Sequence, residues 1–264
     1  MDKSSLLGVT VAIGGILLGL LLEGGRMAQI LQPTAAMIVF GGTLGAVMIQ
    51  FPLRVIIAAS RRLGQVFVDN SKDPNVLIQE IVGYAQKARK EGIVSLDNDL
   101  ATIRDPFLKK SLMLAVDGTE PQEIRKMMEL ELDNQSEHED HLPRVFESAG
   151  GFAPTIGIIG AVLGLIQVMQ HLDDISEVGK GIAVAFVATI YGVASANIFF
   201  LPSAGKLKLR MRELQLTREM ILEGVISILE GLNPRMVETK LRGFLVEGTQ
   251  EKKGAEGEQK KEAS

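Results

Sequence analysis

Residues 148–172 read SAGGFAPTIGIIGAVLGLIQVMQHL, and this stretch contains no Asp, Glu, Lys or Arg. Three further stretches, 4–22, 27–53 and 181–205, are uncharged as well. An α-helix needs about 20 apolar residues to cross a bilayer, so each stretch is long enough to span one. Four transmembrane helices are therefore predicted, at about 5–22, 34–53, 152–170 and 182–201.

The composition excludes several other classes of protein. Of the 264 residues, 46% are hydrophobic and 23% are charged, and the charges are concentrated between and after the uncharged stretches. The chain has no cysteine, which excludes a disulfide framework and a thiolate metal site. Its net charge of −4 provides no basic surface for nucleic acid. A soluble globule, a nucleic-acid binder and a disulfide scaffold therefore do not fit this sequence.

No group of residues has the spacing of an active site or a metal site. His138 and His141 are three residues apart in an acidic stretch, and none of the three histidines, including His171, has ligand partners with metal-site spacing. The glycine-rich phosphate loop of nucleotide-binding proteins is absent from the sequence. We therefore expect no enzymatic activity, no metal and no cofactor.

Lysine and arginine residues close to the spans predict the orientation in the membrane, because cytoplasmic loops are enriched in them. The two short loops between paired spans hold only Arg26 and Lys180. The long segments after the second and fourth spans open with basic residues, namely Arg54, Arg61, Arg62, Lys206, Lys208, Arg210 and Arg212. Both long segments and both termini are therefore predicted to be cytoplasmic.

The whole chain is predicted to be an all-α polytopic membrane protein with four transmembrane helices and a helical cytoplasmic domain. The predicted parts are transmembrane helices 1 and 2 at 5–53, the cytoplasmic domain at 54–147, transmembrane helices 3 and 4 at 148–204, cytoplasmic C-terminal helices at 205–246 and a disordered tail at 247–264. Apolar periodicity, with proline at helix starts and glycine at helix ends, predicts the cytoplasmic helices. They run from Pro74 to Gly92, from Pro106 to Gly118, from Pro121 onward, over 206–230 and over 235–246.

The four predicted spans contain no residue that could carry a proton. Proton and ion pathways normally include an Asp, Glu, His, Lys or Arg, and these spans have none. Thr189 is isolated in an apolar run, where a threonine usually bonds the carbonyl four residues earlier in its own helix. Either the protein moves no protons, or a partner helix brings the carboxylate.

Small residues and two prolines are the other notable features of the spans. Glycines such as Gly157 and Gly164 let helix backbones approach closely, which fits packing within the chain as well as oligomerisation or the seating of a partner helix. Pro154 and Pro202 lie near the cytoplasmic ends of the third and fourth spans. The residues alone favour a helix start and a helix stop there, although a proline can also act as a hinge.

A charged cluster lies where the first cytoplasmic helix is predicted to end. It contains Lys87, Arg89, Lys90 and Glu91, followed by Asp97 and Asp99. Basic residues at a helix C-terminus interact favourably with the helix dipole. On this evidence alone the cluster is interpreted as solvated surface.

A set of short motifs along the chain forms a combination that is specific to one family. They are ARKEG at 88–92 with SLD at 95–97, DPFLKK at 105–110 with VDG at 116–118, APTIGIIG at 153–160, ATIYG at 188–192 and GLNPR at 231–235. With these motifs the chain resembles, over about residues 5–246, the MotA/PomA A subunit of the bacterial flagellar stator. This family lies within the wider MotA/TolQ/ExbB group.

The resemblance implies a function and a set of partners. In this family a ring of five A subunits surrounds two copies of a MotB-type B subunit, whose single membrane helix carries the essential aspartate. Ion flow through that aspartate turns the ring, and the cytoplasmic domain pushes on the rotor protein FliG. The resemblance thus implies a homo-oligomeric protein of the bacterial inner membrane that binds the bilayer and no nucleic acid.

The resemblance also implies roles for individual residues. Arg89 and Asp97 match rotor-contact positions, and Lys90 is a weaker candidate for the same contact. Pro154 and Pro202 match positions that couple ion passage to movement, and Thr189 matches the ion path. The family usually has Glu at the position of Asp97, so charge is retained but the reach is shorter by one methylene.

The resemblance also bears on which ion is used. Sodium-driven relatives have an acidic residue at the position of Gln32 and hydroxyls at the positions of Ala161 and Ala188. Without these oxygens the site is poorer for a hard cation, which needs several oxygen ligands. A proton is therefore favoured.

Two alternative functions fit parts of the sequence. An ExbB/TolQ-type energiser of an outer-membrane system uses a similar channel but has three spans, whereas four are predicted here with the large insert between the second and third. A membrane scaffold without transport fits the composition and the missing carboxylate, and only the motifs argue against it.

Overall fold

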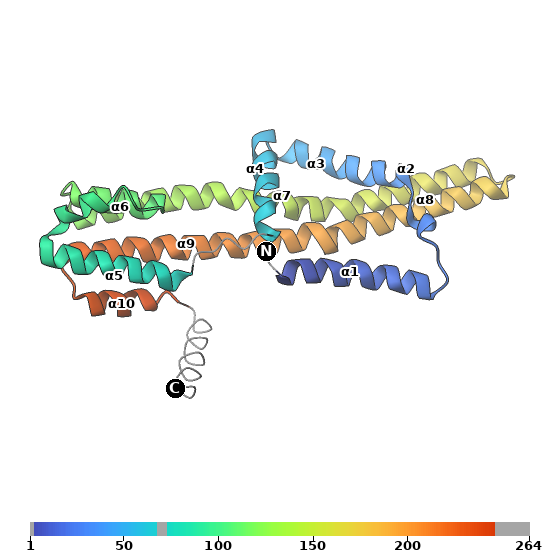
Figure 1. Ribbon diagram of the computed structural model, residues 1–264. Coiled ribbons are helices and arrows are strands. Elements are labelled where there is room, and N and C mark those ends of the chain that lie inside the picture. Colours follow the sequence, from blue (N-terminus) through green and yellow to red (C-terminus); the bar gives the residue numbers. More distant parts are fainter. Residues whose placement is uncertain (1–2, 68–72, 246–264) are drawn as a thin grey trace, which may run out of the picture. The chain divides into compact units, whose positions relative to one another are not determined.

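The computed structural model describes residues 3–67 and 73–245, and within these ranges all regular elements are helical (Figure 1). The chain divides into two compact units. The first, called here the membrane unit, comprises residues 1–70 and 138–210, and the second unit comprises residues 71–137 and 211–264. The predicted tail at 247–264 lies outside the described residues. Four helices are long and apolar enough to cross a membrane, which confirms the all-α, four-span prediction.

The helices of the membrane unit follow the order of the predicted spans. They are α1 (Lys3–Leu22), η1 (Met27–Ile30), α2 (Pro33–Ala36), η2 (Met37–Gly41), α3 (Gly42–Gln50), α4 (Leu53–Phe67), the last part of α7 (Pro121–Gln170), α8 (Ile175–Ala194), η4 (Ser195–Phe200) and the start of α9 (Leu201–Leu229). Here η1 is a 3₁₀-helix, whereas η2 and η4 are π-helical segments. The second span is therefore not one regular helix, and it ends at Gln50 rather than at residue 53.

The prediction that Pro154 starts a helix and Pro202 stops one is wrong. Pro154 lies inside α7, which runs without a break from Pro121 to Gln170, so no helix boundary separates residues 147 and 148. Pro202 is the second residue of α9, which continues directly from η4. A proline removes only one hydrogen bond of the ladder, and all other backbone groups in lipid still need an internal partner. The helical path is therefore retained through both prolines.

Small residues hold α7 and α8 together in the membrane unit. A Cβ added to Gly157 would lie 2.9 Å from the Ala188 carbonyl oxygen, and one added to Gly192 would lie 2.5 Å from that of Ala153. At Gly164 the added Cβ would lie 2.7 Å from the Gly181 oxygen. The two backbones therefore touch directly, and the interpretation of these glycines as packing within the chain is confirmed.

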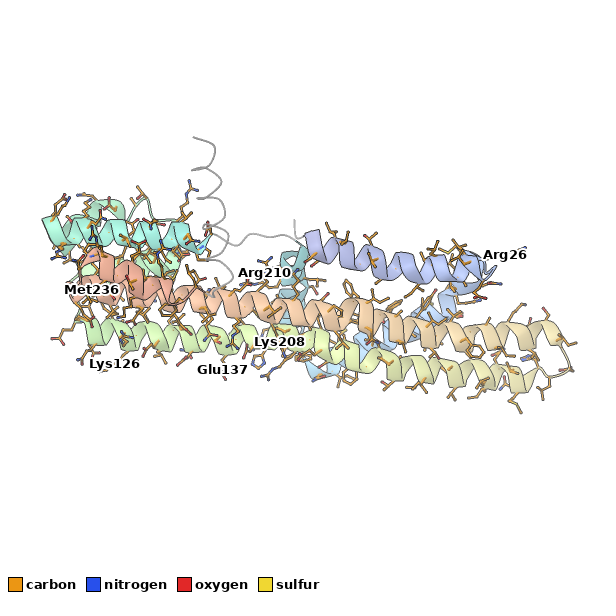
Figure 2. The ribbon with its side chains drawn as sticks, turned by 90° about the horizontal axis from the view of Figure 1, so that it is seen from below. Arg26, Lys126, Glu137, Lys208, Arg210 and Met236 are labelled. Carbon is orange, nitrogen blue, oxygen red and sulfur yellow. The ribbon has the colours of Figure 1, made fainter. Side chains whose placement is uncertain are left out.

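Two polar contacts link the first part of α9 to α1 and to α7. Lys206 Nζ donates to Ser5 Oγ of α1 at 2.7 Å, and Lys208 Nζ lies 2.5 Å from Glu147 Oε1 of α7. Figure 2 shows Arg26 at the end of α1 that is far from Lys208 and Arg210. Basic side chains thus gather at one end of the membrane unit.

The second unit is a helical domain with an apolar core. Its elements are α5 (Pro74–Glu91), η3 (Ile93–Asp99), α6 (Pro106–Val116), the first part of α7, the last part of α9 and α10 (Pro234–Arg242). The side chains of Asp73, Asp105 and Asn233 accept hydrogen bonds from the first turns of α5, α6 and α10. Their proline at N1 needs no such partner. Helices are present where they were predicted in this region, but their bounds differ: the one from Pro121 continues as the third span, the one predicted at 206–230 begins at Leu201 directly after η4, and the one predicted at 235–246 ends at Arg242.

An ion-pair network joins three helices of the second unit. Glu223 of α9 accepts from Arg125 of α7 at 2.9 Å and also pairs with Lys240 of α10. Burial disfavours the charged form of the Glu223 carboxyl, but the hydrogen bonds from Lys240 and Arg125 outweigh it and hold its pKa below its usual range. The contribution of Glu223 to stability is therefore present near neutral pH and is lost as the pH falls through its lowered pKa.

Replacing Gly164 with valine should force α7 and α8 apart, because the new side chain would meet backbone atoms of Gly181 and Ala185 that cannot move aside. We expect a cost of about 1–3 kcal/mol and a lower unfolding temperature of the protein in detergent. Gly45→Val is the matched control, since a Cβ at Gly45 meets nothing within 4 Å. Equal unfolding temperatures of the two variants would contradict the packing argument.

Candidate functional site

The α7–α8 contact brings together several residues that the sequence singled out. Gly157 lies one turn after Pro154, and a Cβ on Gly157 would lie 3.5 Å from Thr189 Cα. Ala188 is fully buried, and its Cβ would lie 2.7 Å from one added to Gly160. Ala161 is partly buried on the neighbouring position of α7. Pro202 is exposed and lies apart from this group, beyond η4.

Thr189 uses its hydroxyl inside its own helix. Its Oγ1 donates to the Ala185 carbonyl oxygen at 3.2 Å, so the predicted bond to the residue four positions earlier is confirmed. The side chain is only partly buried. A hydroxyl in this geometry keeps free lone pairs, and it can therefore accept a further hydrogen bond from a group outside the chain.

Tyr191, which the sequence analysis did not single out, joins the fourth span to the start of the second. Its hydroxyl donates to the Ile30 carbonyl oxygen at 2.6 Å and accepts from the Gln32 backbone N–H at 3.3 Å. Its ring stacks on Phe40 with centroids 6.0 Å apart. Leu31 and Gln32 are extended, so these backbone groups have no helical partner, and an unpaired one is costly in lipid. Its place in the ATIYG motif was the only signal in the sequence.

Two irregular features of the spans were also missed. The π-helical segments η2 and η4 interrupt the second and fourth spans, and such segments are frequent at functional sites. Thr43, the second residue of α3, has a buried hydroxyl without a hydrogen-bond partner among the described residues. None of these features has a periodicity that distinguishes it from an ordinary apolar helix.

The charged cluster at the end of α5 is organised by a tight turn. Gly92 has φ +83°, which favours glycine, and it ends α5 so that η3 turns back. Leu96 of η3 is fully buried in the core of the second unit, while its neighbour Asp97 is exposed. Lys87 Nζ lies 2.7 Å from Asp99 Oδ2, which fixes η3 against α5.

The charged residues of this cluster therefore fall into two groups, those that pair with each other and those whose side chains have no partner in the described part of the chain. Lys87 and Asp99 pair with each other, whereas Arg89, Lys90 and Asp97 are exposed and their side chains have no hydrogen bond or ion pair within the described residues. The structure thus brings the three predicted contact residues to one turn of the second unit with their charges free. Such a surface can bind a partner that carries both signs of charge.

The fold and these features define a polytopic helical membrane protein with uncharged spans and an exposed charged cluster outside them. Two family models match it: the MotA/TolQ/ExbB proton channel family over residues 99–220, and the motility protein A N-terminal family over residues 6–92. The second match covers the first two spans, which favours motility protein A over the ExbB/TolQ alternative.

Individual relatives agree with these matches. Motility protein A of Bacillus subtilis is 35% identical, with 93% of this chain and 91% of the relative covered. The structure of MotAB from C. jejuni matches with a TM-score of 0.89 at 32% identity, covering 94% of this chain and 97% of the other. The flagellar MotAB stator complex of Bacillus subtilis matches with a TM-score of 0.87 at 35% identity, covering 95% and 99%. The chain belongs to the motility protein A family.

Replacing Tyr191 with phenylalanine should loosen the start of the second span while keeping the stack on Phe40. The two lost hydrogen bonds are worth about 1 kcal/mol each, or about 2 kcal/mol together, so hydrogen exchange of the Gln32 amide should accelerate by up to about thirtyfold. Tyr84 is the only other tyrosine, and its hydroxyl donates to Glu80 one turn earlier in α5, so Tyr84→Phe is the control. Unchanged exchange at Gln32 would show that the hydroxyl is not needed there.

Proposed function

We propose that this chain is the A subunit of a bacterial flagellar stator, which forms an ion channel with a one-span MotB-type partner and couples ion flow to rotation of the flagellar rotor. The observation that carries the proposal is the combination of membrane spans without an ionisable group and, outside them, the exposed side chains of Arg89, Lys90 and Asp97, which have no partner within the described residues. The solved relatives are described as MotAB complexes, which supports a partner of this kind.

The partner is needed for the ion step itself. A membrane ion path normally has an ionisable group, and the spans of this chain have none. The partner's single membrane helix therefore brings the essential aspartate. This chain contributes the wall of the path around Thr189, Ala161 and Ala188, where the hydroxyl of Thr189 is the only polar group of the three.

Pro154 and Pro202 couple ion passage to movement in this proposal. Each proline leaves one carbonyl of its helix without the usual N–H partner, and such positions bend more easily than a regular helix. Pro202 also lies directly after the π-helical segment η4, and such segments are frequent at functional sites. A change in the charge of the partner's aspartate shifts the bend at these two points.

The protein lies in the inner membrane as a multi-pass subunit with both termini in the cytoplasm, and five copies form a ring. The position of Arg26 at the opposite end of the membrane unit from Lys208 and Arg210 supports this orientation (Figure 2). Large apolar side chains on the outside of α1 and α7, such as Leu7 and Met169 (each 68% exposed), suit contact with lipid or a neighbouring subunit.

The rotor contact is made by Arg89 and Asp97, with Lys90 beside them, against oppositely charged residues of FliG. Asp97 is one methylene shorter than Glu, and the pairing of Lys87 with Asp99 holds its turn in a fixed position. The ion is the proton, because Gln32, Ala161 and Ala188 provide no carboxylate or hydroxyl for sodium at those positions.

Reversing the charge of Arg89 should abolish or strongly reduce swimming, because Arg89→Glu places like charges together at the rotor, where breaking a buried charge pair costs about 2–5 kcal/mol. Membrane insertion and copurification with the partner should be unchanged. Lys126→Glu makes the same charge change at an exposed site of α7 and should swim normally (Figure 2). A matching reversal on the rotor should partly restore Arg89→Glu, and normal swimming by this variant would refute the contact.

The driving ion can be tested in a host that lacks its own stator and receives this chain with its cognate partner. Swimming should persist in medium without sodium and stop when a protonophore is added, because no sodium-binding oxygens are expected at positions 32, 161 and 188. A swimming speed that follows sodium concentration at constant membrane potential would show that sodium drives the motor.

A further inference from the structure

Helix α4 follows the second span after only Phe51 and Pro52, and it differs from all the spans in its surface. Ala59 is fully buried, and Val55 and Ile56 are partly buried on the same side. The opposite side carries Leu53 (59% exposed) and Ile57 (44% exposed), one turn apart. A helix that buries one face in its own protein and still exposes a second apolar stripe needs another apolar surrounding for that stripe.

Two arginines lie beside this exposed stripe. Arg54 and Arg61 are exposed and lie about 20° apart around the helix axis, since seven residues make nearly two full turns. Neither has an ion pair or hydrogen bond among the described residues, whereas Arg62, on the inner side, pairs with Glu139 of α7 at 3.3 Å. The pair to Glu139 fixes the helix, and the other two guanidinium groups remain available.

The direction of α4 relative to the spans indicates whether it crosses the bilayer or lies along its surface. Figure 1 shows α4 at the end of α3, pointing at a steep angle to α1 and α3 instead of parallel to them. Phe51 is extended and Pro52 precedes the first turn, so the chain changes direction at the end of the span. Because α1 and α3 cross the bilayer, a helix perpendicular to them at the point where α3 ends lies in the plane of the membrane surface.

We infer that α4 is an interfacial helix that binds anionic phospholipid headgroups of the leaflet in which α3 ends. Leu53 and Ile57 enter the acyl-chain boundary, and Arg54 and Arg61 bind lipid phosphates beside them. Charge complementarity favours lipid over a second copy of this chain, because the exposed face of α4 carries two positive charges and no carboxylate, so two such faces would repel each other. Guanidinium groups match phosphate oxygens through two parallel hydrogen bonds.

The chain has no tryptophan, which allows a direct test. Ile57→Trp, in the complex with its partner, is reconstituted into vesicles of phosphatidylethanolamine and phosphatidylglycerol in which one of the two lipids is brominated on its acyl chains. Fluorescence of the complex without this substitution is subtracted. We expect brominated phosphatidylglycerol to quench about twice as strongly as brominated phosphatidylethanolamine at an equal fraction of brominated lipid, because the arginines enrich anionic lipid at α4.

Substituting Arg54 and Arg61 tests whether their positive charge causes the preference for phosphatidylglycerol. In the Ile57→Trp background, Arg54→Gln with Arg61→Gln should abolish the preference for phosphatidylglycerol, and Arg54→Lys with Arg61→Lys should keep it. Val11→Trp on the exposed face of α1 should be quenched equally by both lipids and reports that each variant remains inserted. Equal quenching of Ile57→Trp by both lipids would exclude selective headgroup binding, and no quenching by either would show that protein covers this face.

Discussion

Direct backbone contact between α7 and α8 is the constraint on which the rest of the membrane unit depends. Gly157, Gly164 and Gly192 allow it, because any side chain there would meet a carbonyl oxygen of the facing helix. Helices in lipid gain little from the hydrophobic effect when they associate, so close packing of small residues supplies the attraction. The contact also positions Val187 and Ala188 of α8, which pack with Ala35 of α2 and Val39 of η2 in one buried apolar cluster.

The dense packing of α7 on α8 explains why the spans contain no ionisable groups. An unpaired charge in the α7–α8 contact would lose its hydration and find no partner, so a carboxylate for ion transfer is better carried by a separate helix. Polar groups are retained only where the backbone requires them, as at Tyr191, whose hydroxyl serves the extended residues between η1 and α2. The charges that the membrane part excludes are exposed instead on η3 and at the end of α5.

Features that depart from regular helix geometry mark the places where the chain changes its surroundings. Pro52 lies where the second span ends and α4 begins, and η4 with Pro202 lies where the fourth span leads into α9. Pro154, by contrast, lies within an unbroken α7, so no loop interrupts the chain between the helix that starts at Pro121 and the third span. A bend at Pro154 would therefore change the direction of one continuous helix, α7, and not of two helices joined by a loop.

The sequence by itself determined the fold class, the four spans, the helices outside the spans and the family, because charge-free stretches and helix caps are local properties of the chain. It also indicated Arg89, Lys90 and Asp97, although not that they stay unpaired while Lys87 and Asp99 bind each other. Only the tertiary structure decided that both prolines lie within continuous helices, that Tyr191 bonds Ile30 and Gln32, and that α4 turns away from the spans. These features depend on contacts between residues far apart in the chain, such as positions 30 and 191, and no local pattern of residue types encodes such a contact.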